Sequence, residues 1–135
     1  MTETKFTTAF GIEVRRAEGG VEARLTLAPQ HLNKRGVAHG GVVAALLDTA
    51  LGAAVVAAIP KEWWCATISL QVQFLDGASH GDLVATGVCL RRGRTTAFAS
   101  GEVRDTTSRL IATAQGSWHL WPQRGAESVG PRDHP

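Results

Sequence analysis

Residues 40–59 read GGVVAALLDTALGAAVVAAI and are followed by Pro60, and this stretch decides the fold. It is long enough for a helix of about five turns, which Pro60 cannot continue. Because it is apolar on every side, the helix is expected to be buried within its own protein. Its length would also suit a membrane span, but Asp48 near its middle would be costly in a bilayer, so no membrane is expected.

Strand patterns flank this helix on both sides. Residues 12–17 and 21–27 are predicted to form a hairpin with Gly19-Gly20 in its turn, and residues 28–39 a loop. Four more strands are predicted after the helix, at 65–75, 83–92, 95–105 and 109–121. In the strand at 65–75, apolar and polar residues alternate. This alternation predicts that one face carries Ile68, Leu70, Val72 and Phe74.

Strands around a single long helix predict an α+β fold. An antiparallel sheet of five to six strands would curl around the central helix and bury most of it. Residues 1–121 are expected to form this one domain. Residues 122–135, rich in Pro, Gly and charge, are expected to form a flexible C-terminal tail. The exposed face of the sheet would need a cover, which oligomerisation could supply.

Composition excludes several classes of function. A net charge of +2 is too small to indicate nucleic-acid binding. Cys65 and Cys89 have no metal-ligand spacing, so no metal is expected, and they are predicted to be free thiols in a reducing cytosol. The sequence has no phosphate-binding loop or dinucleotide fingerprint, so no cofactor is expected. The polar N-terminus lacks the apolar core of a signal peptide, which favours a cytoplasmic location.

Asp48 is the strongest candidate for chemistry. It is the only charged residue between His39 and Pro60. A carboxylate on a buried helix is costly unless it is hydrogen-bonded or lies in a cleft, and that cost often marks a functional site. The alternative is an Asp that faces solvent or bonds to neighbouring backbone.

His39-Gly40-Gly41 at the start of the helix is the second candidate. Glycines there leave backbone N–H groups open to a ligand, and the helix N-terminus attracts negative charge. Asp48 lies roughly 12 Å further along the axis, so one chain would not place both groups on one small substrate. Two helices packed antiparallel would bring Asp48 of one subunit near Gly40 of the other. The spacing therefore predicts a site shared across a dimer, although an ordinary glycine-rich helix start is the alternative.

The pattern Asn33-x-x-Gly36-x-x-His39-Gly40-Gly41, with Leu47-Asp48 after it, resembles the hotdog-fold thioesterases of the phenylacetic-acid-degradation type. The segments at 67–82 and 91–105 fit the same family. The resemblance implies a hotdog fold and hydrolysis of a small aryl- or medium-chain acyl-CoA to the free acid and CoA. It also implies a homo-oligomer. The expected assembly is at least a dimer, and two dimers are expected to form a tetramer.

The resemblance also implies roles for single residues. Asn33 and the Gly40 N–H would polarise the thioester carbonyl. Asp48 of the partner subunit would act as a general base or as a nucleophile. Thr67 would orient the water or the carboxylate, since Gly52 stands where some relatives have a threonine. His39 and Gly41 would contribute at the helix start, His39 mainly by ordering the loop.

Arg91, Arg92 and Arg94 surround Gly93 at a predicted hairpin. Guanidinium groups bind phosphate well, so these arginines are candidates for holding the CoA phosphates, with Lys34 and Arg35 as candidates to assist. A solvated turn is the alternative. Trp63 and Trp64 could line an acyl pocket or pack at a subunit interface.

Two other functions remain open. The first is an acyl-CoA binding or sensing protein without catalysis, against which Asp48 argues. The second is a hydratase on the same fold, which would need a His and an Asp on one side of an alkene. The best-placed histidine, His39, lies instead at the start of the helix.

Overall fold

The computed structural model describes residues 5–122 of the chain. Two α-helices and six strands follow one another in these residues, together with a short 3-10 turn at Pro29–His31. Their bounds are α1 Lys5–Phe10, β1 Glu13–Ala17, β2 Gly20–Thr26, α2 Gly40–Ala58, β3 Trp63–Phe74, β4 Asp82–Arg92, β5 Thr96–Arg104 and β6 Leu110–Pro122. The predicted tail lies outside the described residues except for Pro122, which ends β6.

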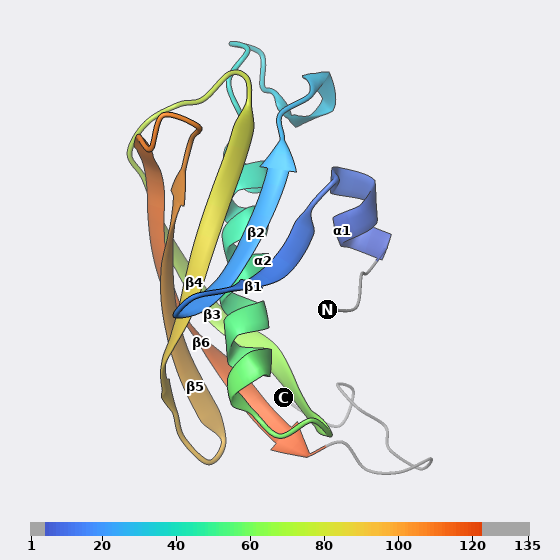
Figure 1. The fold of residues 1–135 in the computed structure, drawn as a ribbon, viewed down its shortest axis with the longest axis vertical. Coiled ribbons are helices and arrows are strands. Elements are labelled where there is room, and N and C mark those ends of the chain that lie inside the picture. The colour runs from blue at the N-terminus through green and yellow to red at the C-terminus, as the bar shows by residue number, and fades with distance from the viewer. Residues whose placement is uncertain (1–4, 123–135) are drawn as a thin grey trace.

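The six strands form one antiparallel sheet in the order β1-β2-β4-β5-β6-β3. The sheet curls along one side of α2, which lies against its inner face (Figure 1). The α+β prediction of a curled antiparallel sheet around one long helix is therefore confirmed. Among the described strands β3 lies at the edge of the sheet, where it pairs with β6 alone.

Helix α2 is the core helix rather than a membrane span, although its length and hydropathy would allow a span. Its buried residues pack with the inner faces of β2, β4, β5 and β6 in one apolar core. Small and polar residues lie on the side of α2 next to the edge strand β3, where Asp48 and Gly52 are only partly buried. The helix ends with Ile59 as its C-cap, directly before Pro60.

A β-bulge in β3 changes which residues face the helix. Thr67 lies opposite Trp118 and Leu70 opposite Gly116, so Ile68 is an extra residue in the ladder. Directly opposite residues share a face of the sheet, and Trp118 is buried on the inner face. Thr67 therefore faces α2 together with Leu70. The predicted alternation is wrong at Ile68, which is 59% exposed.

Helix α1 was not predicted from the sequence. Tertiary contacts hold this short helix, because the Ile12 N–H donates to the Thr7 carbonyl and the buried His31 contacts the carbonyl of Phe10. His31 Nδ1 accepts from the Ala28 N–H at 2.9 Å, so Nε2 carries the proton and donates to Phe10. His31 is thus a structural link between α1 and the loop before α2.

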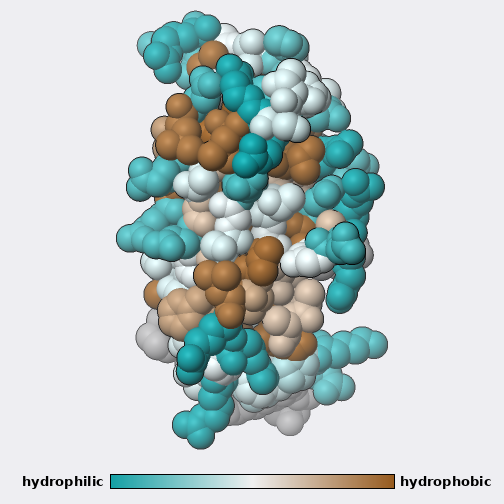
Figure 2. All heavy atoms as spheres, turned by 60° about the vertical axis from the view of Figure 1, so that its left-hand side comes forward, coloured by the Kyte–Doolittle hydropathy of each residue, from teal (hydrophilic) through white to brown (hydrophobic). Residues whose placement is uncertain are grey.

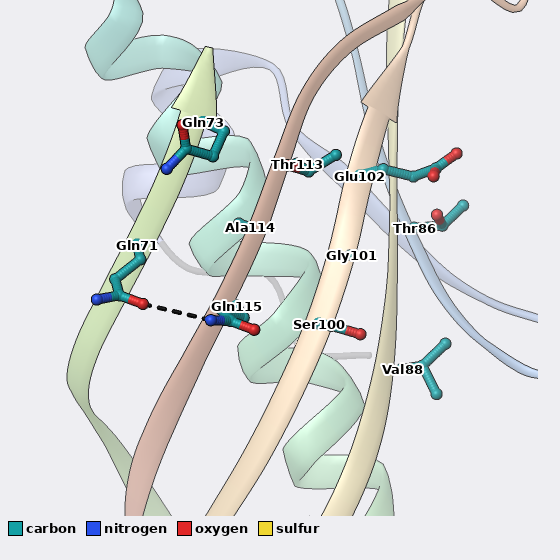
Figure 3. A pocket seen from close by; sticks show the side chains of 10 residues that line it. All are labelled: Gln71, Gln73, Thr86, Val88, Ser100, Gly101, Glu102, Thr113, Ala114 and Gln115. Atoms are coloured by element: carbon teal, nitrogen blue, oxygen red, sulfur yellow. Dashed lines mark hydrogen bonds between the residues drawn. The ribbon is translucent and has the colours of Figure 1, made fainter. Parts of the chain in front are cut away.

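The outer face of the sheet is mixed in character. Figure 2, which brings forward the side formed by β5 and β6, shows brown apolar groups separated by white and teal ones. A shallow hollow on this face is lined by polar side chains, including Gln71 and Gln115, which are hydrogen-bonded to each other (Figure 3). Helix α2 lies behind the sheet in that view, and none of the predicted site residues lines the hollow.

Candidate active site

The loop before α2 presents the amide of Asn33. Asn33 Oδ1 accepts hydrogen bonds from the backbone N–H groups of Arg35 and Val37, at 2.9 and 3.3 Å. The turn closes through the Gly36 N–H, which donates to the Asn33 carbonyl, and Gly36 has a φ of +81° that favours glycine. Because Oδ1 is engaged by two donors, the Asn33 NH₂ group is left to donate to a ligand.

The first turn of α2 leaves one backbone donor open. His39 is the N-cap, and its Nδ1 accepts from the Gly41 N–H at 2.8 Å. The N–H groups of Val42 and Val43 donate to the His39 carbonyl. Gly40 N–H has no acceptor within residues 5–122. His39 therefore caps the helix, and the Gly41 N–H is already hydrogen-bonded to it. The Gly40 N–H is left as the donor available to a ligand.

Asn33 and Gly40 line one pocket of about 360 Å³. Phe74, at the end of β3, lies on its other side and is 57% exposed. A Cβ on Gly40 would lie 3.5 Å from the Phe74 ring, so glycine keeps this part of the pocket open. Sequence reasoning placed Phe74 only on a strand face. Its position at the last residue of β3, beside the helix start, depends on tertiary structure.

Asp48 and Thr67 form the second part of the candidate site. The Thr67 hydroxyl donates to Asp48 Oδ1 at 2.9 Å, which joins the middle of α2 to the edge strand β3. The bulge at Ile68 makes this contact possible, because it turns Thr67 toward the helix. Asp48 is partly buried and Thr67 is exposed, so the pair is accessible from outside the single chain.

Cys65 lies near the same carboxylate. It is two residues before Thr67 on the inner face of β3, opposite Leu120. Burial, with a smaller contribution from the negative charge of Asp48, raises the pKa of the Cys65 thiol to about 11. Cys65 and Cys89 are both free cysteines, as predicted. A thiol held in its protonated form is a poor nucleophile, so Cys65 is not a candidate for covalent catalysis.

One chain does not bring the two parts together. Asn33 and Gly40 share the pocket at the start of α2, and neither Asp48 nor Thr67 lines it. Eight residues of helix separate Gly40 from Asp48, which corresponds to roughly 12 Å along the axis.

The three arginines do not form one patch. Leu90 is an extra residue in β4, so that Arg91 lies opposite Phe98 and Arg92 opposite Ala97. Phe98 is exposed on the outer face and Ala97 is buried on the inner face. Arg91 therefore belongs to the outer face, whereas Arg92 belongs to the inner one. Arg94 lies in the hairpin turn, where it is exposed.

The two neighbouring tryptophans also separate. Trp63 packs against the core with the Arg92 guanidinium 5.5 Å from its ring centroid. Trp64 lies opposite Trp121, with their ring centroids 6.2 Å apart. Because successive strand residues point to opposite faces, only Trp63 lies on the face that carries Thr67.

The fold, the N–H donors at Asn33 and Gly40 and the carboxylate of Asp48 together define the class of protein. It is a hotdog-fold hydrolase of thioesters. The chain belongs to the thioesterase superfamily, whose family model matches residues 35–112. That match covers the Asn33–Gly40 loop from residue 35 onward, all of α2, and strands β3 to β5.

Individual relatives agree with this class. A Halobacterium salinarum protein named as an esterase is 34% identical over 124 residues, which cover 82% of this chain and 81% of that protein. Acyl-coenzyme A thioesterase 13 of Mus musculus is 32% identical over 93 residues, covering 67% of this chain and 66% of that enzyme. The crystal structure of the Bacillus halodurans protein BH2602 with CoA superimposes with a TM-score of 0.81 at 26% identity, covering 89% and 78% of the two chains.

Proposed function

We propose that this thioester hydrolase acts on acyl-CoA, with a small aryl or medium-chain acyl group, as a cytoplasmic enzyme of the phenylacetic-acid-degradation type. The similarity to an acyl-CoA thioesterase and to a structure that contains CoA supports the choice of CoA. Phe74 beside Gly40 and Trp63 on the inner face of β3 offer apolar surface near the two parts of the site. These contacts favour an acyl group with aromatic or aliphatic character.

The active site is proposed to be shared by two subunits. Strand β3 is twelve residues long, and its free edge offers backbone groups to a second strand. Ile68 on this strand and Leu75 directly after it are 59% and 56% exposed. Antiparallel pairing of β3 with its copy would also set the two α2 helices antiparallel. Asp48 of each subunit would then lie near Gly40 of the other, as the helix spacing requires. Two such dimers would pair into the proposed tetramer.

The proposed reaction uses each group for one task. The Gly40 N–H and the Asn33 NH₂ donate to the thioester carbonyl oxygen and stabilise the negative charge that develops on it. In the general-base route, Asp48 takes a proton from water while the water oxygen bonds to the carbonyl carbon. The C–S bond then breaks, and the CoA thiolate leaves and takes up a proton. In the nucleophilic route, an Asp48 oxygen attacks first and water cleaves the resulting anhydride.

Basic residues at two places are proposed to hold the CoA phosphates. Lys34 and Arg35 are exposed beside Asn33, and Arg91 and Arg94 are exposed at the β4–β5 hairpin. Antiparallel α2 helices would bring the first group of one subunit toward the second group of its partner. Arg92 could reach the same phosphates only from the inner face, over Trp63.

The hydrogen bond between Asp48 and Thr67 is the observation that carries this proposal. The experiment is hydrolysis of a panel of acyl-CoAs, with thiol release recorded for the wild type and for Asp48→Asn. The asparagine keeps the shape of the side chain but can neither accept a proton nor attack. We expect kcat on the best substrate to fall by about a thousandfold or more. An Asp48→Asn variant as fast as the wild type would exclude Asp48 as the catalyst. A wild type that binds acyl-CoA without turnover would overturn the choice of substrate.

A further inference from the structure

Trp118 lies under the carboxylate part of the site. It is on the inner face of β6, directly opposite Thr67, and is only 1% exposed. Gly116 allows this position, because a Cβ there would lie 2.9 Å from the Trp118 ring. Buried tryptophans usually donate their indole N–H to an acceptor. Within residues 5–122 the Nε1–H of Trp118 donates to no other group.

The indole nitrogen of Trp118 borders an empty space at Gly52. A Cβ built on Gly52 would have Trp118 Nε1 as its nearest neighbour, at 3.5 Å. Glycine is a poor helix former. The space around Gly52 would accept an alanine, because the new Cβ would make only an ordinary van der Waals contact. The missing side chain therefore leaves a notch on α2, which we call the Gly52 notch, with an unused N–H donor at its floor.

The Gly52 notch lies one helical turn after Asp48. Residues four apart on a helix have Cβ atoms about 5–6 Å apart and share one face. Thr67 occupies Oδ1 of Asp48, and Oδ2 accepts no hydrogen bond from residues 5–122. A single water molecule can accept from Trp118 Nε1–H and donate to Asp48 Oδ2 when these two atoms lie within about 5.6 Å of each other, since each of its hydrogen bonds is about 2.8 Å long.

We propose that Trp118 is a further catalytic residue, whose indole N–H holds the attacking water in the Gly52 notch. This inference rests on the proposed function and on its general-base route. The water oxygen accepts from Trp118 Nε1–H and donates one proton to Asp48 Oδ2. Its second lone pair is then free to bond to the thioester carbon, while Asp48 receives the proton and later returns it to the CoA thiolate.

The first test removes the donor and keeps the ring. Trp118→Phe should lower kcat by about tenfold, with little change in KM, because the water loses one of its two anchors. Trp121→Phe is the matched control, since it makes the same change on the same strand but on the other face of the sheet. It should leave kcat unchanged. Melting temperatures of both variants identify any loss of folding.

The second test fills the notch without disturbing the core. In Gly52→Ala the new methyl group meets only an ordinary van der Waals contact, so the protein should fold with an unchanged or higher melting temperature. The methyl group would nevertheless exclude the water, and kcat should fall by about tenfold or more. A more stable but slower enzyme is an outcome that a purely structural role of Gly52 would not produce.

Each result supports or overturns the inference. Wild-type kcat in Gly52→Ala, or in a folded Trp118→Phe, would overturn it. A higher KM for bulky acyl groups alone, with kcat for acetyl-CoA unchanged, would show that the notch holds the acyl group and would also overturn it. Absence of turnover by the wild type, or full activity of Asp48→Asn, would instead refute the proposed function.

Discussion

The hydroxyl of Thr67 donates a 2.9 Å hydrogen bond to Asp48 Oδ1, and so connects an edge strand to the middle of the buried helix. The two residues are 19 positions apart, and the bulge at Ile68 is what turns Thr67 toward α2. A carboxylate held by one hydroxyl has its second oxygen free in a fixed direction. That arrangement suits a group that must accept a proton from one side only.

The first prediction concerns this hydrogen bond. Thr67→Val keeps the size of the side chain but cannot donate, so Asp48 loses its orientation. Hydrogen bonds to charged groups contribute about 1.5–3 kcal/mol, which corresponds to a fall in kcat of about ten- to a hundredfold if the orientation matters fully in the transition state. Thr67→Ser retains the donor and should keep most of the activity. Equal kcat values for the valine and serine variants would contradict a role for the hydroxyl.

The second prediction tests whether the site is shared. A heterodimer of Asp48→Ala and Asn33→Ala subunits, purified through two different tags, would contain one intact site and one site with both defects. Its activity should be about half that of the wild-type dimer, while each parent homodimer should be nearly inactive. If Asp48 and Asn33 of the same chain worked together, the heterodimer would be as inactive as its parents.

The third prediction uses Cys65 as a reporter of charge at Asp48. Burial and, to a smaller extent, the charge of Asp48 raise the pKa of this thiol to about 11. Alkylation by iodoacetamide near neutral pH should therefore be slow. In Asp48→Asn the repulsion of the thiolate is gone, the pKa of Cys65 should fall, and alkylation should be faster. Peptide mass spectrometry over time would measure the rate at Cys65. Cys89 is the internal control, because Asp48 does not contribute to its raised pKa.

The fourth prediction concerns the turn between β5 and β6. The pKa of Asp105 is lowered from 3.8 to about 2, mainly because the Thr107 hydroxyl donates a hydrogen bond to its carboxylate. Burial opposes this effect, whereas the backbone N–H groups of Arg109 and Thr107 and the charge of Arg109 add to it. A folded-state pKa below the ordinary value stabilises the protein above about pH 4 and loses this effect as the pH falls through about 2.

Asp105→Asn should therefore lower the melting temperature at neutral pH, and the difference from the wild type should shrink between about pH 4 and pH 2. Thermal unfolding followed by circular dichroism at several pH values would measure it. A difference that is constant over this range would mean that the carboxylate charge is not the cause. Arg109 joins this turn to the pocket, because it pairs with Asp76 and donates to the Gly77 carbonyl.

Sequence reasoning recovered most of the fold because its signals are local. The apolar run at 40–59 and Pro60 predicted α2 to within one residue of its observed end. The strands after it also lie close to the predicted ranges, since Gly and polar turn residues separate them. Helix α1 was missed because six residues carry no useful periodicity, and its stabilising partner, His31, lies beyond β2.

The candidate site was predicted in its residues but not in its geometry. Asp48 stood out because a charge in an apolar helix is costly, and Thr67 was proposed as its partner only through a family resemblance. A bulge depends on the pairing of two strands, so no local pattern could show that Thr67 faces the helix or that Arg92, rather than Arg91, lies on the inner face of the sheet. Phe74 and Trp118 were missed for the same reason, since an ordinary apolar strand residue has no distinguishing signal.

The extra residue at Ile68 determines which side chains of β3 face the helix. If β3 were regularly pleated at its present length, with Ile68 paired instead of bulged, everything before it would rotate by half a turn, and Thr67, Cys65 and Trp63 would face outward together. The position of Thr67 therefore depends on the bulge being kept, more than on the identity of the side chain at residue 68. An enzyme without this bulge would keep its helix and its carboxylate, but Thr67 would no longer face Asp48.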